Sequence, residues 1–184
     1  MSRKPQRLAR KLIYDHALLN VYEDRVQYPA GLLVERHAFL DFKNPGVAIL
    51  MHNENNEILL AHVFRYILDS VEWEIPAGTT HAGEDALETA RREALEESGY
   101  EAVDLKHLYD YYPSSGIANQ VFKIYTCRAG SKIADFDRSE IAAVKWFKHA
   151  EIWGMIRRNE IKDGFSLTAL LLFLTSAPSS DDGR

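Results

Sequence analysis

AGTTHAGEDALETARREALEESGY spans Ala77 to Tyr100 and holds Glu93, Glu96 and Glu97 within five residues. Positions i, i+3 and i+4 share one face of an α-helix, so the three glutamates are expected on a single acidic face. Like charges at this spacing destabilise a helix by roughly 0.2–0.5 kcal/mol per pair. The crowding of carboxylates therefore needs a physical reason.

The apolar residues of the stretch predict a helix over residues 86–97. Alanines and leucines recur at spacings of one, three and four and form a stripe on another face. This stripe consists of Ala86, Leu87, Ala90, Ala94 and Leu95. Gly83 or a neighbour is expected to cap the helix start, with Glu84 and Asp85 near the positive end of its dipole. Gly99 stands where a left-handed residue commonly ends a helix.

Two explanations of the acidic face are compatible with the residues alone. From Glu84 to Glu97 there are six acids and two bases, a net charge of -4. Such a face can be plain surface decoration of a solvated helix. It can also hold a hard divalent cation such as Mg2+, which takes oxygen ligands from carboxylates, water and substrate phosphates. A bound metal would relieve the repulsion.

Composition and length set the broad class. The 184 residues suffice for one compact domain with a small appendage, and 46% are hydrophobic. The net charge of -5 gives no general reason to expect a nucleic-acid partner. No apolar run reaches the length of a signal peptide or a membrane span, so a cytoplasmic protein without a membrane partner is expected. Cys127 follows a strand-like run and is interpreted as a structural thiol.

The pattern along the chain predicts an α+β fold. Short strands are expected within residues 11–44, with a turn at 29–31. VAILMH at 47–52 is a continuous apolar run of the kind found in a buried central strand. Further strands and one or two late helices are expected in the segments ILLAHVFRYI, VEWEIPAG, QVFKIYTCRA, IAAVKWF and 149–176. We divide the chain into an N-terminal β extension (1–44), a main domain (45–176) and a flexible tail (177–184).

The spacing around the helix resembles the signature of the Nudix hydrolase family, G-x5-E-x7-R-E-U-x-E-E-x-G-U, where U is bulky and apolar. All seven fixed letters match, and only the U positions Ala94 and Tyr100 depart mildly. The resemblance implies a mixed β-sheet between helices and metal-dependent cleavage of a nucleoside diphosphate linked to another group. It implies that Glu93 and Glu97 bind metal, with Glu96 and the carbonyl of Ala77 as further ligands. The residues expected to support this site are Gly78, Glu84, Arg92 and Gly99.

A second resemblance narrows the substrate. WEIPAG before the signature is similar to the E-L/I-P-A-G of ADP-ribose pyrophosphatases and their nucleotide-sugar relatives. Residues 11–44 resemble the extra N-terminal strands of that subfamily, which build a dimer interface and part of the nucleotide site. The substrate-binding residues implied are Arg65, Glu74, Ser115 and Gly116. Asn119 and Gln120 stand where the subfamily often has an acidic residue, which bears on sugar or base preference.

The subfamily takes its general base from a glutamate on a late loop. DFDRSE offers Glu140, with Asp135 and Asp137 nearby, and Glu96 is a second candidate. A solvated loop charge is the alternative interpretation of Glu140.

These observations predict Mg2+-dependent hydrolysis of a nucleoside diphosphate sugar, with Mn2+ as the alternative metal. ADP-ribose, cleaved to AMP and ribose 5-phosphate, is the leading substrate. The alternatives are a hydrolase of a GDP- or UDP-sugar and a non-catalytic Nudix-fold binding module. The intact set of glutamates argues against the binding module. A homodimer that buries residues 11–44 is expected, because short strands without their own core need a cover.

Overall fold

The computed structural model describes residues 4–176, and its chain divides into two compact units. The first comprises the chain up to Pro45 together with Tyr112–Val121, and the second comprises Gly46–Tyr111 and the chain from Phe122 onward. The domain boundary predicted at residue 45 assigned residues 112–121 to the main domain. In the structure, these residues group with the first unit instead. The expected tail at 177–184 lies outside the described residues.

Within residues 4–45, the first unit forms a three-stranded antiparallel sheet in the order β1-β2-β3. Its strands are β1 (Gln6–Asp15), β2 (Leu19–Gln27) and β3 (Leu33–Phe42). The first strand therefore begins earlier than the expected position 11, and all three are nine or ten residues long. The predicted turn is a short 3-10 helix, η1 (Pro29–Gly31). The 112–121 loop joins this sheet, because the Leu40 amide donates to the carbonyl of Ile117 at 2.8 Å.

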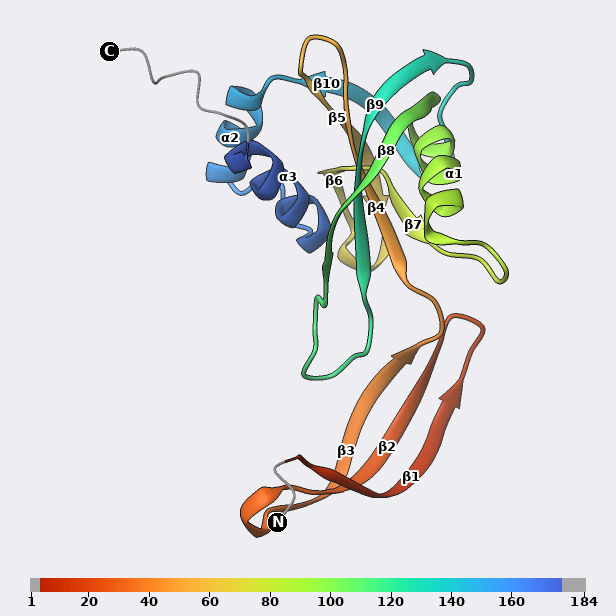
Figure 1. The fold of residues 1–184 in the computed structure, drawn as a ribbon, viewed down its shortest axis with the longest axis vertical. Coiled ribbons are helices and arrows are strands. Elements are labelled where there is room, and N and C mark those ends of the chain that lie inside the picture. The colour runs from red at the N-terminus through yellow and green to blue at the C-terminus, as the bar shows by residue number, and fades with distance from the viewer. Residues whose placement is uncertain (1–3, 177–184) are drawn as a thin grey trace. The chain divides into compact units, whose positions relative to one another are not determined.

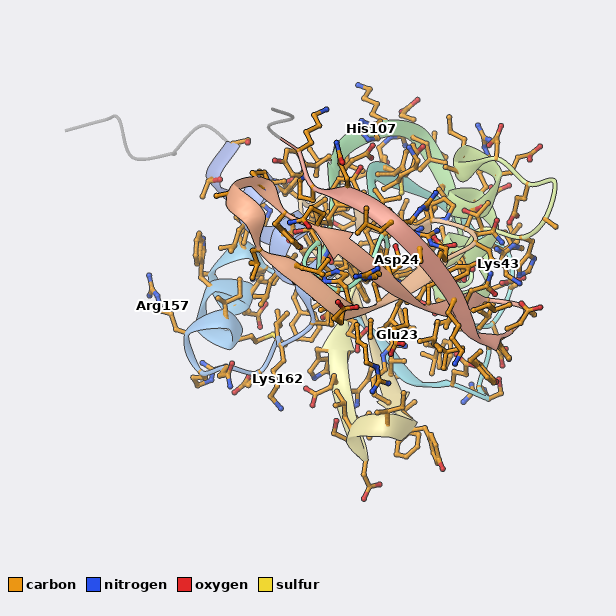
Figure 2. All side chains as sticks on the ribbon, turned by 90° about the horizontal axis from the view of Figure 1, so that it is seen from below. Glu23, Asp24, Lys43, His107, Arg157 and Lys162 are labelled. Carbon is orange, nitrogen blue, oxygen red and sulfur yellow. The ribbon has the colours of Figure 1, made fainter. Side chains whose placement is uncertain are left out.

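An ion pair between an exposed arginine and a buried aspartate lies on this sheet. Arg10 donates to both carboxylate oxygens of Asp24 at 2.8 Å, and Asp24 lies on β2 next to Glu23 (Figure 2). The guanidinium carbon of Arg10 stands 4.6 Å from the ring centre of Tyr22 and 4.8 Å from that of Phe39. The hydrogen bonds from Arg10 lower the pKa of Asp24. Aromatic rings and a paired charge, rather than an aliphatic core, thus cover this part of the sheet.

The second unit contains a mixed sheet of seven strands within the described residues, in the order β10-β5-β4-β9-β8, with β6 on β5 and β7 on β4. The strands are β4 (Gly46–His52), β5 (Ile58–Arg65), β6 (Ser70–Glu74), β7 (Ala77–Thr79), β8 (Tyr100–Tyr111), β9 (Phe122–Lys132) and β10 (Ile141–Phe147). The sheet is mixed because β4 and β9 run parallel while the other pairs are antiparallel. A 3-10 helix, η2 (Tyr66–Leu68), connects β5 to β6.

Helices cover both faces of this sheet. Helix α1 (Ala86–Ser98) lies on one face, and α2 (His149–Arg157) and α3 (Gly164–Ser176) lie on the other (Figure 1). The predicted α+β architecture, a mixed sheet between helices, is therefore confirmed. In the described part of the chain, no helix is both long and apolar enough to cross a membrane.

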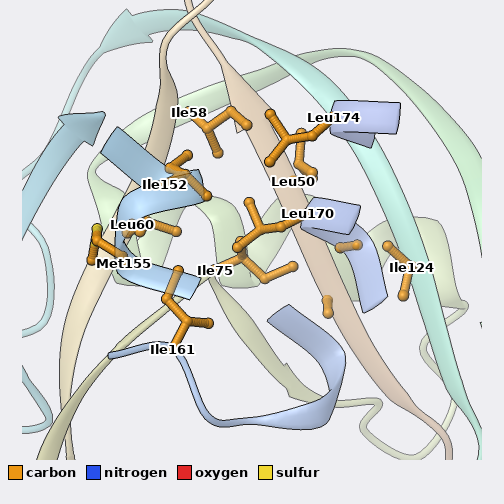
Figure 3. Close-up of a cluster of buried hydrophobic side chains, with 12 residues drawn as sticks. Leu50, Ile58, Leu60, Ile75, Ile124, Ile152, Met155, Ile161, Leu170 and Leu174 are labelled. Carbon is orange, nitrogen blue, oxygen red and sulfur yellow. The ribbon is translucent and has the colours of Figure 1, made fainter. Parts of the chain in front are cut away.

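The central strand β4 explains the continuous apolar run at 47–52. Successive side chains of a strand point to opposite faces of the sheet. Val47, Ile49 and Met51 pack in the cluster that includes residues of α1, and Ala48 and Leu50 pack in the cluster with α2 and α3 (Figure 3). All five are fully buried, so both faces of β4 must be apolar.

Cys127 lies in the same interior, on β9, and is a buried free cysteine. Burial raises the pKa of its thiol to about 12, which keeps the thiol protonated and unreactive at neutral pH. The prediction of a structural thiol is confirmed.

Helix α1 begins and ends on side-chain and backbone signals. Asp85, not Gly83, is the N-cap: its side chain accepts hydrogen bonds from the amides of Leu87 and Glu88. The Glu88 carboxylate accepts the Asp85 amide in return, which completes a capping box. Gly83 instead supplies a positive φ of 86° to the turn before the cap.

Gly99 ends α1 in the left-handed region, with φ 79° and ψ 2°, as predicted. A Cβ at this position would lie 2.2 Å from the carbonyl oxygen of Ala134. Gly99 therefore satisfies two constraints, the backbone conformation and the close approach of the chain after β9.

Replacing Gly99 by alanine is expected to destabilise the protein more than Gly83→Ala. Both positions have positive φ, so both variants lose roughly 1–2 kcal/mol of stability to backbone strain. Only Gly99→Ala also clashes with backbone, which adds roughly 1–3 kcal/mol. Denaturant unfolding of both variants measures the difference. Equal losses of unfolding free energy in the two variants would show that the contact with Ala134 does not contribute to stability.

Candidate active site

The three glutamates of α1 differ in their exposure. Glu93 is only 8% exposed and Glu97 is half-buried, whereas 52% of the Glu96 side chain is exposed. The three glutamates predicted to share one acidic face therefore lie in two different environments. Two carboxylates turn toward the protein and one turns toward solvent.

Arg92 links the acidic side chains around the helix. Its Nη1 donates to Glu93 at 2.7 Å and to Glu96 at 3.0 Å. Its Nε and Nη2 donate to the two oxygens of Glu84 at 2.9 and 3.0 Å, and Nη2 also reaches the carbonyl of Thr79 at 3.2 Å. One guanidinium thus offsets part of the repulsion among the crowded acids.

Glu84 fixes this guanidinium in place. Besides Arg92, its carboxylate accepts the backbone amide of His81 and the hydroxyl of Thr89, each at 3.0 Å. The hydrogen bonds from Arg92, and then the one from the His81 amide, lower the pKa of Glu84 to about 2. Glu84 is therefore ionised at neutral pH and acts as a fixed anchor for Arg92.

Strand β7 approaches two of the glutamates closely. A Cβ on Gly78 would lie 1.8 Å from Oε1 of Glu93, so the carboxylate occupies the space that any larger residue would fill. The neighbouring Ala77 amide donates to Oε2 of Glu97 at 3.0 Å. The backbone of β7 and the carboxylates of α1 thus form one cradle.

Burial makes the ionised forms of both carboxylates costly. Desolvation raises the pKa of Glu93, although hydrogen bonding to Arg92 acts in the opposite direction. Desolvation raises the pKa of Glu97 to about 8, opposed by the hydrogen bond from Ala77. Near neutral pH Glu97 therefore favours a proton or a nearby cation.

The chemistry of this donor set fits a divalent metal ion. Carboxylate and carbonyl oxygens are the ligands that Mg2+ and Mn2+ take, and the missing Cβ of Gly78 leaves room for Glu93. As the side chains lie, no three His, Cys, Asp or Glu residues within 4–176 form a ready-made metal cluster. Instead, Glu93 and Glu96 are both paired with the guanidinium of Arg92.

Arg65 and Glu74, both predicted to contact substrate, are bound to each other. Arg65 on β5 donates through Nε to Oε1 of Glu74 at 2.8 Å and through Nη2 to Oε2. Glu74 is 1% exposed, whereas 38% of the Arg65 side chain is exposed. Arg65 is therefore the accessible member of the pair, and Glu74 holds it in place.

Glu140 lines the same cavity as Arg65. This cavity has a volume of about 660 Å³ and is bordered by η2 and by the loop before β10. The lining residues are Phe64, Arg65, Tyr66, Ile67, Leu68, Ser139 and Glu140. The Glu140 carbonyl accepts the Phe64 amide at 3.1 Å, and the Asp137 amide donates to the Glu96 carbonyl at 2.7 Å. The loop that carries Glu140 is thus tied both to β5 and to α1.

Ser115 and Gly116 belong to the first unit, whereas the glutamates belong to the second. They line a cavity of about 460 Å³ together with His37 and Phe39 of β3. Asn119 fixes this loop, because its side chain accepts the Phe42 amide at 2.6 Å and donates to Asp41 at 2.6 Å. Asn119, which stands where the subfamily often has an acidic residue, therefore anchors this loop to the backbone at the end of β3.

A polar group at the start of α3 was not predicted from the sequence. Asp163 and Ser166 lie beside Arg65 and Glu74, and burial raises the pKa of Asp163 to about 7. An aspartate before an apolar helical run is an N-cap signal, which was available in DGFSLTALLLF. The contact of Ser166 with Ile75, 91 residues away, has no local signal.

Comparison with known proteins agrees with this geometry. The NUDIX domain family matches residues 42–168. A CMP-5'-(N-acetyl-N-hydroxy-3-aminopropyl)phosphonate hydrolase of Streptomyces rubellomurinus is 28% identical over 89% of this chain and 79% of its own length. An ADP-ribose pyrophosphatase of Bacillus subtilis is 27% identical over 89% of each chain.

A solved structure described as an ADP compounds hydrolase has the same fold. It superposes with a TM-score of 0.78 over 92% of each chain, at 19% identity. The family match, the signature and the fold agree, and the chain belongs to the Nudix family. It is a hydrolase of the pyrophosphatase type, related to the ADP-ribose pyrophosphatases.

Gly78→Ala is expected to weaken divalent-metal binding while leaving the fold intact. The φ of Gly78 is not positive, so alanine adds little backbone strain, but its Cβ displaces the Glu93 carboxylate. Displacing one ligand should weaken Mn2+ binding roughly 10–100-fold. Titration calorimetry with Mn2+ measures the affinity, and Gly83→Ala is the control because its Cβ meets nothing within 4 Å. Unchanged affinity in Gly78→Ala would contradict the cradle.

Proposed function

We propose that this protein hydrolyses the pyrophosphate bond of a nucleoside diphosphate sugar with Mg2+, and that ADP-ribose is its leading substrate. The products are AMP and ribose 5-phosphate. The observation that carries the proposal is the cradle in which Glu93 and Glu97 meet the backbone of Gly78 and Ala77. The similarity to an ADP-ribose pyrophosphatase supports the choice of substrate.

In this proposal, Glu93, Glu97 and the carbonyl of Ala77 hold the metal, with Glu96 as a further ligand. When bound, a divalent cation supplies positive charge to the pyrophosphate and lowers the pKa of a coordinated water. Arg92 would orient the carboxylates that hold the metal, and Glu84 would anchor Arg92. Mg2+ is preferred over Mn2+ because it commonly bridges carboxylates and phosphates.

Substrate binding falls to groups outside the helix. The exposed part of Arg65 is suited to a phosphate oxygen, and Glu74 keeps the guanidinium oriented. In the first unit, Ser115 and Gly116 line a cavity with Phe39, whose ring suits a planar or apolar group.

The general base is assigned to Glu140. A carboxylate other than Glu93 and Glu97 must accept the proton of the attacking water, because those two are committed to the metal. Glu140 is exposed and lines the cavity that contains Arg65. Glu96 is the second candidate, although its carboxylate already accepts a hydrogen bond from Arg92.

The substrate is tested with a panel of nucleoside diphosphate compounds. The panel comprises ADP-ribose, GDP-mannose, a UDP-sugar and a CMP-phosphonate, each assayed with Mg2+, with Mn2+ and without metal. ADP-ribose is expected to have the highest kcat/KM, and turnover should vanish without metal. Preference for another compound would change the substrate but keep the reaction. Failure to cleave any compound would favour a binding module.

Glu97→Gln is expected to keep the fold and to lower turnover by at least about a hundredfold, because a neutral amide replaces a charged ligand. Steady-state kinetics on the best panel substrate measure the loss. Glu88→Gln is the matched control, since Glu88 lies on the same helix and only completes the cap. Wild-type turnover in Glu97→Gln would refute the metal site.

Glu140→Gln is expected to lower kcat by roughly 10²–10⁴-fold, the usual contribution of a general base. Mg2+ affinity should stay near the wild-type value, because Glu140 is not a proposed ligand. Glu96→Gln, in contrast, should disturb metal binding as well. If Glu140→Gln keeps kcat within about threefold of wild type, the base is Glu96 or one of the nearby aspartates, Asp135 and Asp137.

A homodimer that buries part of the first unit is expected. Every residue of β1 is exposed, and four of them are large and apolar: Leu8, Leu12, Ile13 and Tyr14. Such a patch on an edge strand favours association. Light scattering at micromolar concentration should give twice the monomer mass, and the double variant Leu12→Asp/Ile13→Asp should reduce it. A wild-type monomer would contradict the expectation.

A further inference from the structure

Ser166 joins the start of α3 to the segment between β6 and β7. Its side chain is fully buried, and its hydroxyl oxygen accepts the backbone amide of Ile75 at 2.9 Å. Ile75 follows the last residue of β6 and precedes Pro76, which has no N–H group. The two residues between the strands therefore carry a single amide donor, and Ser166 is its partner.

This short segment determines where β7 lies. Ile75 follows Glu74, whose carboxylate binds Arg65, and the carbonyl of Pro76 accepts the Ile49 amide of β4 at 2.8 Å. The next residue is Ala77, whose amide meets Glu97 at 3.0 Å. A shift of Ile75 would thus move Ala77 relative to α1.

Asp163 in turn holds Ser166. Its Oδ2 accepts the Ser166 amide at 2.7 Å, which caps the first turn of α3. Its Oδ1 is buried and has no hydrogen-bond partner among the described residues. The charged groups that face it are Glu74 of β6 and Arg65 of β5, and Tyr111 of β8 lies close enough to respond to its charge.

We propose that Ser166, held by Asp163, is a positioning residue that sets the contact between Ala77 and Glu97. Ser166 acts through the Ile75 amide and does not touch substrate. Its importance for turnover rests on the proposed function, whereas its effect on the Ala77 amide does not. The two effects are therefore measured separately.

The first measurement is amide hydrogen exchange in the metal-free protein. In Ser166→Ala, the Ile75 amide loses its acceptor, and the Ala77 amide is expected to exchange at least about tenfold faster than in wild type. Thr168→Ala is the matched control, because it removes a hydroxyl from the same helix whose bond stays within α3, to the carbonyl of Gly164. The control should leave exchange at Ala77 unchanged.

The second measurement is steady-state hydrolysis of ADP-ribose with Mg2+. Ser166→Ala should lower kcat roughly 10–100-fold, as loss of a residue that orients a ligand does, with a smaller change in KM. Thr168→Ala should retain wild-type kinetics. If the wild type prefers another compound of the panel, that compound replaces ADP-ribose in this measurement. If the wild type hydrolyses none of them, the proposed function fails and the exchange measurement alone decides the positioning role.

Asp163→Asn separates positioning from proton transfer. Asparagine keeps a carbonyl oxygen that can accept the Ser166 amide but cannot act as a base. The exchange rate at Ala77 and kcat should both stay within about threefold of wild type, whereas Asp163→Ala should resemble Ser166→Ala. Loss of activity in Asp163→Asn with wild-type exchange at Ala77 would overturn the proposal, because it would assign Asp163 a chemical role.

Wild-type exchange at Ala77 in Ser166→Ala would also overturn it. Should Ser166→Ala not fold, Ser166→Cys keeps a side chain at the position with only a weak acceptor. Ser166→Cys, like Ser166→Ala, is expected to make the Ala77 amide exchange faster than in wild type. An unchanged exchange rate at Ala77 would contradict the proposal.

Discussion

The contact between the Glu93 carboxylate and the backbone of Gly78 is the constraint on which the candidate site depends. Helix α1 can come this close to β7 only because residue 78 has no Cβ. The same approach uses small residues on the buried face of the helix, where Ala90 and Ala94 are fully buried. Close packing, in turn, removes water from the carboxylates and raises their pKa values. The packing of the helix and the chemistry of the site therefore have one origin.

Arg92 is what allows these acids to coexist in the absence of a further cation. Its guanidinium reaches three carboxylates and one backbone carbonyl from a single planar group. Lysine has one nitrogen and could not hold this geometry with comparable precision. Glu84 binds the guanidinium through Nε and Nη2, whereas Glu93 and Glu96 share the remaining nitrogen, Nη1.

Local patterns predicted the elements that are specified locally. The expected helix at 86–97 is observed at Ala86–Ser98, and the apolar run at 47–52 is the central strand because both of its faces are covered. The cap was misplaced by two residues. Glycine and aspartate both favour this position, and only the hydrogen bonds of Asp85 distinguish them.

Long-range contacts could not be predicted from one sequence. The bond between Ser166 and Ile75 joins residues 91 positions apart, and nothing near either residue indicates it. The 112–121 loop joins the first unit through Asn119, whose partners at Asp41 and Phe42 lie far away along the chain. In the register of β5 and β6, Arg65 lies opposite Ser70 and Glu74 lies opposite Ala61, so strand pairing alone does not indicate the bond between Arg65 and Glu74. These contacts follow from tertiary structure rather than from residue spacing.

The end of α1 connects the helix to the candidate base. The last carbonyls of a helix have no partner within it and must find donors elsewhere. Gly99 satisfies the carbonyl of Leu95, and the Asp137 amide satisfies that of Glu96. The amides of Ile133 and Ala134 then bind the Gly99 carbonyl, so the chain after β9 runs along the helix terminus. Satisfying these backbone groups holds the loop before β10 beside the turn that carries Glu96 and Glu97, and the loop ends at Glu140. The hydrogen bonds that satisfy the last carbonyls of α1 thus also determine where the segment that carries Glu140 lies relative to this helix.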